Sequence, residues 1–158
     1  MGIAAKIMTI TTALGGILRH PLRIQYAALP YRHMDGKLEF MLITSRETAR
    51  WIVPKGWPRR DGEAILSVLE EAWEEAGLRG KVFPDSVGSY IYDKNMQGGY
   101  KVHCKVIVFA MAVESVVDEY PEAGSRKRMW VSAEEAASRV VEPDLAAMFF
   151  KLRADLAG

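Results

Sequence analysis

The sequence lacks most of the features that define specialised classes of protein. Its 158 residues hold one cysteine, Cys104, which can form neither an internal disulfide nor, on its own, a zinc or iron–sulfur site. No apolar run reaches the roughly 20 residues that cross a bilayer, and 21 basic against 20 acidic residues give a net charge of +1. We therefore expect one domain of ordinary size in a reducing cytoplasm, with neither a membrane nor a stable nucleic-acid partner.

Common catalytic motifs are missing too. No P-loop, GxGxxG, HExxH or GxSxG pattern occurs in the sequence, so ATPase, dehydrogenase, zinc protease and serine hydrolase functions have no support. The three histidines, His20, His33 and His103, are isolated and lack the spacing of metal ligands. Packing or surface roles are expected for them.

The first 22 residues differ in composition from the rest of the chain. They are apolar and nearly uncharged up to Arg19. This composition faintly resembles a signal peptide, but no small-residue cleavage site precedes Arg19. A peripheral helix or an extended arm is the favoured interpretation. Residues 1–22 are therefore predicted to be an N-terminal extension, and residues 23–158 the folded domain.

Strand patterns surround a helical segment. The first strand, residues 24–32, contains Pro30 and is expected at a sheet edge or a bulge, because proline cannot donate to a ladder. Further strands are predicted at residues 38–44, 51–53, 100–113 and 129–131, with one or two more within 79–93. A helix should start after Ser132, where Glu135 completes a capping box, and another should span residues 143–156. This order favours an α+β fold with helices packed on a mixed sheet.

The most informative segment is residues 53–80, a loop followed by a helix. Its proline and glycine content makes residues 54–62 a loop, and Asp61 is expected to cap the helix N-terminus. Gly77 stands where a left-handed C-terminal cap belongs. Between these two residues an apolar stripe recurs at helical spacing: Ile65, Val68, Leu69, Ala72 and Ala76.

Four glutamates, Glu70, Glu71, Glu74 and Glu75, lie away from that stripe. Like charges three or four residues apart each destabilise a helix by about 0.2–0.5 kcal/mol. The helix dipole adds about 0.3–1 kcal/mol for each acid near the C-terminus. The arrangement is poor for stability and good for gathering oxygen ligands around Mg²⁺ or Mn²⁺. A solvated acidic helix face is the alternative interpretation.

The spacing of this segment resembles the Nudix box, G-x5-E-x7-R-E-U-x-E-E-x-G-U, in which U is an apolar residue. Six positions match from the first glycine onward: Gly56, Glu71, Glu74, Glu75, Gly77 and Leu78. Two positions depart. The first Glu of the box falls on Gly62, and Glu70 replaces the Arg, which in the family typically holds a catalytic carboxylate in place.

The resemblance extends along most of the chain. The segments LITSR at 42–46, WIVPKG at 51–56 and SRKRMWV at 125–131 are similar to the diphosphoinositol polyphosphate and diadenosine polyphosphate phosphohydrolase branch. The resemblance implies a Nudix-like α/β/α sandwich over residues 23–158, with a mixed central sheet, a smaller antiparallel sheet and a catalytic loop–helix–loop. It also implies a metal-dependent pyrophosphohydrolase that acts on a highly phosphorylated, anionic small molecule, as a monomer or a homodimer.

The resemblance further implies roles for particular residues. The catalytic and metal-binding carboxylates are Glu71, Glu74 and Glu75, and the Gly56 carbonyl is a further ligand of Mg²⁺ or Mn²⁺. One carboxylate must act as general base; Glu71 is one candidate, and the alternatives outside the box are Glu114, Glu119 and Glu122. Substrate phosphates need cations, for which the candidates are Arg46, Lys55, Arg126 and Arg128. Strand alternation places the last two of these on one face.

Two other functions stay open. Glu70 and Gly62 are compatible with a binding or regulatory module on the same scaffold, with weak or no catalysis. A hydrolase of mRNA caps or RNA ends would use the same chemistry. The only extra basic run is residues 126–128, which is too short for an RNA-binding track.

Overall fold

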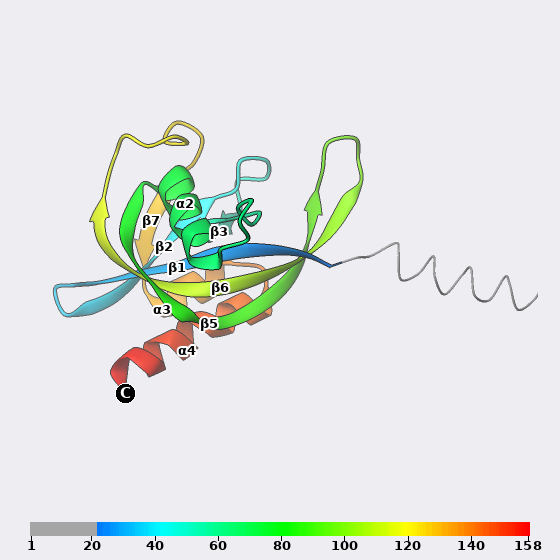
Figure 1. Ribbon diagram of the computed structural model, residues 1–158. Coiled ribbons are helices and arrows are strands. Elements are labelled where there is room, and N and C mark those ends of the chain that lie inside the picture. Colours follow the sequence, from blue (N-terminus) through cyan, green and yellow to red (C-terminus); the bar gives the residue numbers. More distant parts are fainter. Residues whose placement is uncertain (1–21) are drawn as a thin grey trace, which may run out of the picture.

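Within residues 22–158, which the computed structural model describes, seven strands form one mixed sheet (Figure 1). The strands are β1 (Arg23–Met34), β2 (Lys37–Thr44), β3 (Trp51–Ile52), β4 (Lys55–Gly56), β5 (Leu78–Asn95), β6 (Lys101–Val116) and β7 (Arg128–Val131). Their order is β3-β2-β1-β6-β5, with β4 paired to β1 and β7 paired to β2. β1 and β6 run parallel, whereas the other pairs are antiparallel. The helix or arm expected before residue 22 lies outside the described residues.

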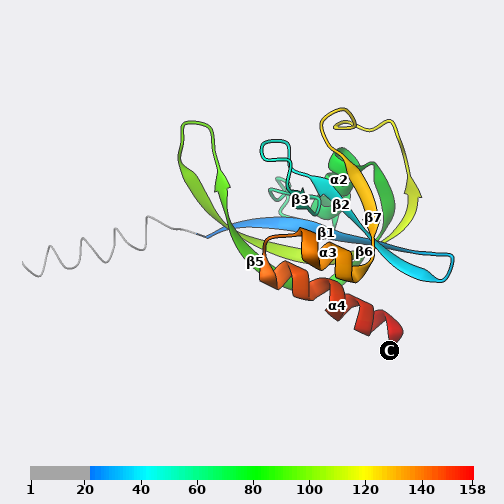
Figure 2. The same cartoon turned by 180° about the vertical axis from the view of Figure 1, so that it is seen from behind.

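Helices cover both faces of this sheet. Helix α2 (Ala64–Ala76) packs on one face, and helices α3 (Ala133–Arg139) and α4 (Pro143–Ala157) pack on the other (Figure 2). One apolar core lies on each face of the sheet, and β2 contributes side chains to both because successive side chains of a strand point to opposite faces. Met41 and Ile43 face α2, whereas Phe40 and Leu42 face α3 and α4. The predicted α/β/α sandwich is confirmed. The strands that we expected in a smaller separate sheet are hydrogen-bonded into the same sheet.

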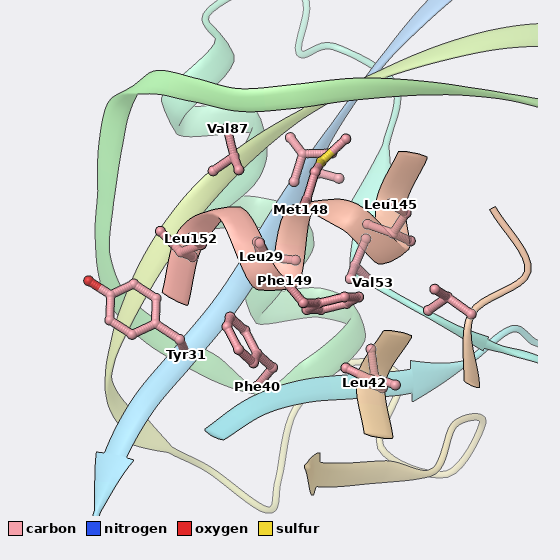
Figure 3. Close-up of a cluster of buried hydrophobic side chains, with 14 of the residues drawn as sticks. Leu29, Tyr31, Phe40, Leu42, Val53, Val87, Leu145, Met148, Phe149 and Leu152 are labelled. Carbon is pink, nitrogen blue, oxygen red and sulfur yellow. The ribbon is translucent and has the colours of Figure 1, made fainter. Parts of the chain in front are cut away.

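Aromatic packing holds α4 against the sheet. The rings of Phe40 and Phe149 meet edge to face with their centroids 5.1 Å apart (Figure 3), an arrangement that adds about 0.5–1.5 kcal/mol beyond the area that it buries. Leu145, Met148 and Leu152 of α4 lie in the same buried cluster. α4 therefore contributes a large part of the apolar core on the face opposite to α2.

The position expected for β1 was wrong. Pro30 suggested an edge or a bulge, but β1 lies between β2 and β6 in the middle of the sheet. Ala28 donates its N–H to Pro54 on the β4 side, and the nitrogen two residues on, at Pro30, must face the same side. β1 pairs with β4 at Tyr26 and Ala27 and with β2 only from Tyr31 onward. Pro30 thus occupies the gap between two partners, where no ladder bond is required of it.

Local details of the loop and helix also differ from the prediction. Glu63, and not Asp61, caps α2, because the Glu63 carboxylate accepts the N–H of Leu66 at 2.9 Å. The segment predicted to be entirely loop contains β4, a short strand that fixes Gly56 beside Tyr26 of β1. Of the one or two strands predicted within residues 79–93, the structure has one, β5, which is longer than expected and has an irregular register against β6.

The predicted helix ends were otherwise correct. Gly77 adopts a left-handed conformation with φ 66° at the C-cap of α2, and the Ser132 side chain caps α3 by accepting the N–H of Glu135 at 3.1 Å. None of the helices in residues 22–158 has both the length and the apolar character needed to cross a membrane.

Candidate active site

Helix α2 lies against β4 so that Glu71 is in direct contact with Gly56. A Cβ atom built on Gly56 would fall far inside van der Waals contact with both carboxyl oxygens of Glu71. Only a residue without a side chain allows this approach. The spacing of the two residues in the sequence therefore has a structural reason: β4 presents a bare backbone to the carboxylate.

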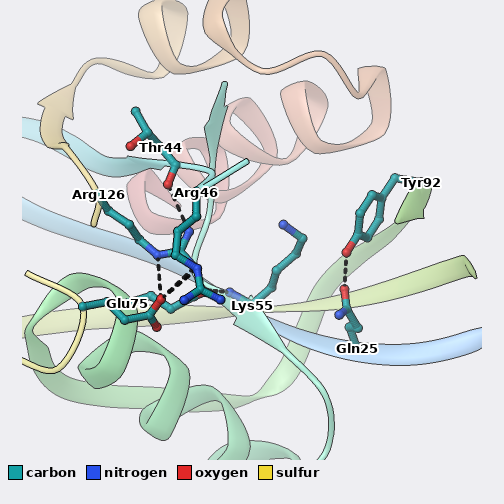
Figure 4. A network of polar contacts seen from close by, with 8 residues as sticks. Gln25, Thr44, Arg46, Lys55, Glu75, Tyr92 and Arg126 are labelled. Carbon is teal, nitrogen blue, oxygen red and sulfur yellow. Dashed lines mark hydrogen bonds and ion pairs between the residues drawn. The ribbon is translucent and has the colours of Figure 1, made fainter. Parts of the chain in front are cut away.

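Glu75 is held on both of its oxygens. The N–H of Lys55 donates to Oε1 at 2.9 Å, and Nη2 of Arg126 donates to Oε2 at 2.5 Å (Figure 4). The Glu75 side chain is only 9% exposed, and Glu71 is also partly buried, whereas Glu70 is exposed. The interpretation of these glutamates as a solvated acidic face is therefore wrong for Glu71 and Glu75.

The glutamates raise one another's pKa. Burial and then the neighbouring charges of Glu75 and Glu74 raise the pKa of Glu71 from 4.5 to about 8. Burial and then the charges of Glu70 and Glu122 raise the pKa of Glu74. Burial also raises the pKa of Glu75, although Arg126 and the Lys55 N–H oppose it. The cluster thus carries more negative charge than its surroundings compensate.

The donor set fits a hard divalent cation. Carboxylates and a backbone carbonyl are the ligands that Mg²⁺ and Mn²⁺ prefer, and Glu71 lies at the Gly56 backbone with no hydrogen bond or ion pair from residues 22–158. In the described part of the chain no three side chains of ligand type have converged around one point. Glu75 is instead turned toward Arg126 and Lys55.

A cavity of about 350 Å³ opens beside Glu75. Five cationic side chains line it: Arg46, Arg50, Lys55, Lys94 and Arg126. The acidic residues in its wall are Glu47, Glu75 and Asp93, and the aliphatic ones are Ile52 and Val141. A wall of this composition is suited to an anionic ligand with several charged groups.

Lys55 is a partly buried member of this set of cations. Burial lowers its pKa from 10.5 to about 8, while the charge of Glu75 opposes that shift. Its Nζ lies 5.0 Å from the ring centroid of Tyr92, whose hydroxyl donates to Gln25 at 2.6 Å (Figure 4). Within residues 22–158 the Lys55 ammonium forms no ion pair, so it can receive a ligand anion.

The four predicted substrate cations have different surroundings. Arg46 and Lys55 line the cavity, and Arg46 also lies 3.4 Å from Glu122. Arg126 lines the cavity, but its guanidinium contacts protein acceptors. Arg128 donates to the carbonyls of Ala76 and Val117 at 2.9 Å each, at the C-terminal end of α2.

Sequence reasoning missed two cations of the cavity, Arg50 and Lys94. Arg50 donates to Glu142 at 2.6 Å, a partner 92 positions away, and Lys94 comes from the far end of β5. Neither position has a local pattern that points to the site. Of the alternative bases, Glu122 lies near the cluster, since its N–H donates to the Glu74 carbonyl at 3.0 Å, whereas Glu114 and Glu119 are exposed.

Comparison with known proteins finds relatives of similar sequence, although no family model matches the sequence. Nudix hydrolase 16, mitochondrial, from Arabidopsis thaliana is 28% identical over 134 residues, which cover 77% of this chain and 74% of that protein. Diphosphoinositol polyphosphate phosphohydrolase 3-alpha from Mus musculus is 30% identical over 112 residues, covering 70% of this chain and 64% of that protein, just under two thirds of its length.

Solved structures show the same fold. An Ap4A hydrolase of C. elegans superimposes with a TM-score of 0.60 at 19% identity, covering 85% of this chain and 98% of that one. The MutT protein of Methanosarcina mazei gives 0.61 at 22% identity, with 88% and 98% covered. The chain thus shares the fold of these solved structures and the spacing of the box, and the curated proteins that it resembles are Nudix hydrolases and diphosphoinositol polyphosphate phosphohydrolases.

Proposed function

We propose that the protein is a divalent-metal-dependent pyrophosphohydrolase that cleaves a phosphoanhydride bond in a compact, highly phosphorylated small molecule. The observation that carries this proposal is the position of Glu75 of α2 in the wall of a cavity lined by five cations, with Glu71 against Gly56, the residue after Lys55. A carboxylate cluster alone would repel a polyphosphate. Next to a cationic wall, it can bind the metal while the wall binds the phosphates.

In this proposal Glu71, Glu74, Glu75 and the Gly56 carbonyl would hold Mg²⁺ or Mn²⁺. The bound ion would neutralise charge on the phosphates and lower the pKa of a water molecule. Arg46, Arg50, Lys55 and Lys94 bind the phosphate oxygens and orient the scissile bond. Glu71 accepts the proton of the attacking water, because of the two box carboxylates that no cation of residues 22–158 pairs with, Glu71 and Glu74, it is the more buried.

The cavity favours a phosphorylated ring over a dinucleotide. Neither Trp51 nor Trp57 lines it; Trp51 lies under Arg139 and Trp57 under Arg23. The tyrosine in the wall, Tyr92, is fixed by Gln25. A diphosphoinositol polyphosphate therefore fits this lining better than a diadenosine polyphosphate, whose adenine would need an open stacking surface.

A substrate panel tests this assignment. Phosphate release is measured with diphosphoinositol polyphosphates, diadenosine polyphosphates, nucleotide sugars and nucleoside triphosphates in Mg²⁺ or Mn²⁺. We expect kcat/KM to be highest for the diphosphoinositol compounds. A higher value for a diadenosine polyphosphate would refute the choice of ring substrate and leave the pyrophosphohydrolase proposal standing.

Replacing Lys94 by Met should raise KM about tenfold and leave kcat unchanged, because one charge-assisted contact to a phosphate is worth about 1.5 kcal/mol. Lys101→Met is the matched control, since Lys101 is exposed on β6 and does not line the cavity. Steady-state kinetics of both variants give the comparison. Equal KM values for the two variants would remove Lys94 from the binding site.

Replacing Gly56 by Ala should lower kcat by about 10–100-fold while the protein stays folded. The added methyl group meets only the end of the flexible Glu71 side chain, so Glu71 must turn away from β4. Gly124→Ala is the control, because its Cβ would have no atom within 4 Å. Kinetics are read together with thermal unfolding. Full activity in Gly56→Ala would show that the Glu71–Gly56 contact has no catalytic role.

A binding module without catalysis remains the second candidate, and the departures from the box at Glu70 and Gly62 favour it. It predicts that substrate raises Tm without being turned over. Gly62 has φ +71° and open space around it, and Glu63 performs the capping role next to it. Turnover of any member of the panel eliminates this candidate.

The cytoplasm is the compartment that we propose. Cys104 is a buried free thiol, which suits a reducing environment. Some relatives carry the words mitochondrial or chloroplastic in their names, so fluorescence microscopy of the full chain is the direct test.

A further inference from the structure

The box position that the family fills with arginine holds Glu70 in this chain. The last turn of α2 contains no basic residue, and Glu70 itself is exposed, 3.7 Å from Arg59. Helix α2 therefore has no cation of its own to orient its glutamates. A positive group that contacts these carboxylates must come from another segment.

Arg126 is that group. It lies two residues before β7, and Nη2 donates to Glu75 at 2.5 Å and to Glu122 at 3.2 Å. Nη1 donates to the carbonyl of Thr44 at 3.0 Å, and Nε donates to Glu122 at 3.3 Å. The side chain is only 6% exposed. With four contacts of this kind, most of the five N–H donors of Arg126 are already used by the protein.

The backbone next to Arg126 is fixed as well. Lys127 donates its N–H to Oγ1 of Thr44 at 2.9 Å, and the N–H of Thr44 donates to the Lys127 carbonyl at 3.1 Å. The end of β2 thus holds the backbone of Lys127, the residue that follows Arg126. Together with the Lys55 N–H on the other oxygen, Arg126 leaves the Glu75 carboxylate a single orientation.

We propose that Arg126 is a positioning residue that performs, from outside the helix, the role of the arginine missing at position 70. It orients Glu75 and Glu122 and does not bind substrate phosphate, in contrast to the role expected from the sequence. This inference rests on the proposed function only for its kinetic test, because the ion pair with Glu75 is a property of the protein without ligand.

The kinetic test compares Arg126→Lys, Arg126→Met and the double variant Arg126→Met/Glu70→Arg on the substrate that the wild type cleaves. We expect Arg126→Met to lower kcat about 10–100-fold with KM changed less than about threefold. Arg126→Lys keeps the positive charge but loses the planar guanidinium that can form two parallel hydrogen bonds. Its kcat should therefore lie between that of the wild type and that of Arg126→Met. Glu70→Arg should restore kcat about tenfold in the Arg126→Met background, because it replaces a negative charge of the glutamate cluster by a positive one and so returns the cation that the cluster has lost.

Three outcomes of the kinetics would overturn the proposal. A raised KM with unchanged kcat assigns Arg126 to substrate binding. Failure of Glu70→Arg to restore any activity shows that Arg126 does not replace the box arginine. An equal loss in Arg32→Met, which also breaks an ion pair but lines no cavity, shows a general effect of lost stability.

A second measurement needs no turnover and separates this proposal from the proposed function. Thermal unfolding in EDTA is compared for wild type, Arg126→Met, Glu75→Gln and the double variant. We expect the double variant to lose less Tm than the sum of the single losses, because Arg126→Met leaves the buried Glu75 carboxylate without its cation and Glu75→Gln removes one charged partner of the buried Arg126. Additive losses would overturn the role of Arg126, even in a protein that hydrolyses its substrate. An absence of turnover in the wild type together with non-additive losses would refute the proposed function alone.

Discussion

Replacing Glu71 by Gln should lower kcat about 10³-fold and, in EDTA, make the protein more stable. Activity falls because Gln cannot carry the negative charge that binds the metal or accept the proton of the attacking water. The loss is at the upper end of what one electrostatic group contributes to a transition state, about 10²–10³-fold. Few residues outside an active site would produce opposite effects on rate and stability.

The sign of the stability effect follows from the pKa of Glu71. Folding raises that pKa from 4.5 to about 8, so the ionised carboxylate is disfavoured in the folded state. The metal-free protein should therefore lose stability as pH rises from about 4.5 to about 8. Glu71→Gln removes this loss and should stabilise the protein at pH 8 by about 1–2 kcal/mol, once solvent screening of a half-buried group is allowed for.

Glu70→Gln is the matched control for this variant. It removes the same charge from the neighbouring position of α2, but Glu70 is exposed and points to Arg59. We expect its kcat to stay within about threefold of wild type. Steady-state kinetics test the expected kcat values, and urea unfolding in EDTA at pH 5 and pH 8 tests the expected stabilities. Glu71→Gln with wild-type kcat, or with lower stability than wild type at pH 8, would contradict the roles given to Glu71.

Features that depend on neighbouring residues could be predicted from the sequence. Gly77 ends α2 because its left-handed conformation follows directly from glycine chemistry. The pairing of Gly56 with Glu71 could be anticipated because the box fixes the spacing of loop and helix. The capping residue was less certain: Asp61 and Glu63 are two positions apart, and the turn at Gly62 decides which of them reaches an N–H.

Features that depend on distant segments could not be predicted. Pro30 was misplaced because the sequence does not show which strands lie on either side of β1. The cavity cations Arg50 and Lys94 come from separate loops and strands that only the fold brings together. The contacts of Arg126 could not be anticipated for a related reason. Its partner Glu75 lies 51 residues away, and a basic run shows that cations are present but not which anions they meet.

Removing divalent metal should abolish turnover, and adding it should stabilise the protein by several degrees. The glutamate cluster explains both effects. Burial and then the charges of Glu75, Glu74, Glu122 and Glu70 raise the pKa of Glu71, whereas the only glutamates of this cluster that Arg126 contacts are Glu75 and Glu122. A divalent ion supplies the missing positive charge. At a concentration about 100 times its Kd, it should add about 2.7 kcal/mol of stability and raise Tm by about 8–10 °C for a chain of this size.

The stabilisation should depend on the box carboxylates in a defined order. Glu71→Gln should remove most of the rise in Tm that Mg²⁺ or Mn²⁺ causes, because Glu71 lies against the Gly56 backbone and its carboxylate has no hydrogen bond or ion pair within residues 22–158. Glu70→Gln should retain the rise, since Glu70 faces away toward Arg59. Thermal unfolding across a metal titration, with turnover measured in parallel in EDTA, tests both parts. Turnover that persists in EDTA, or an equal rise in Tm for the two variants, would exclude a metal site at the α2 glutamates, and the cavity would then have to be explained as an anion-binding site without a metal.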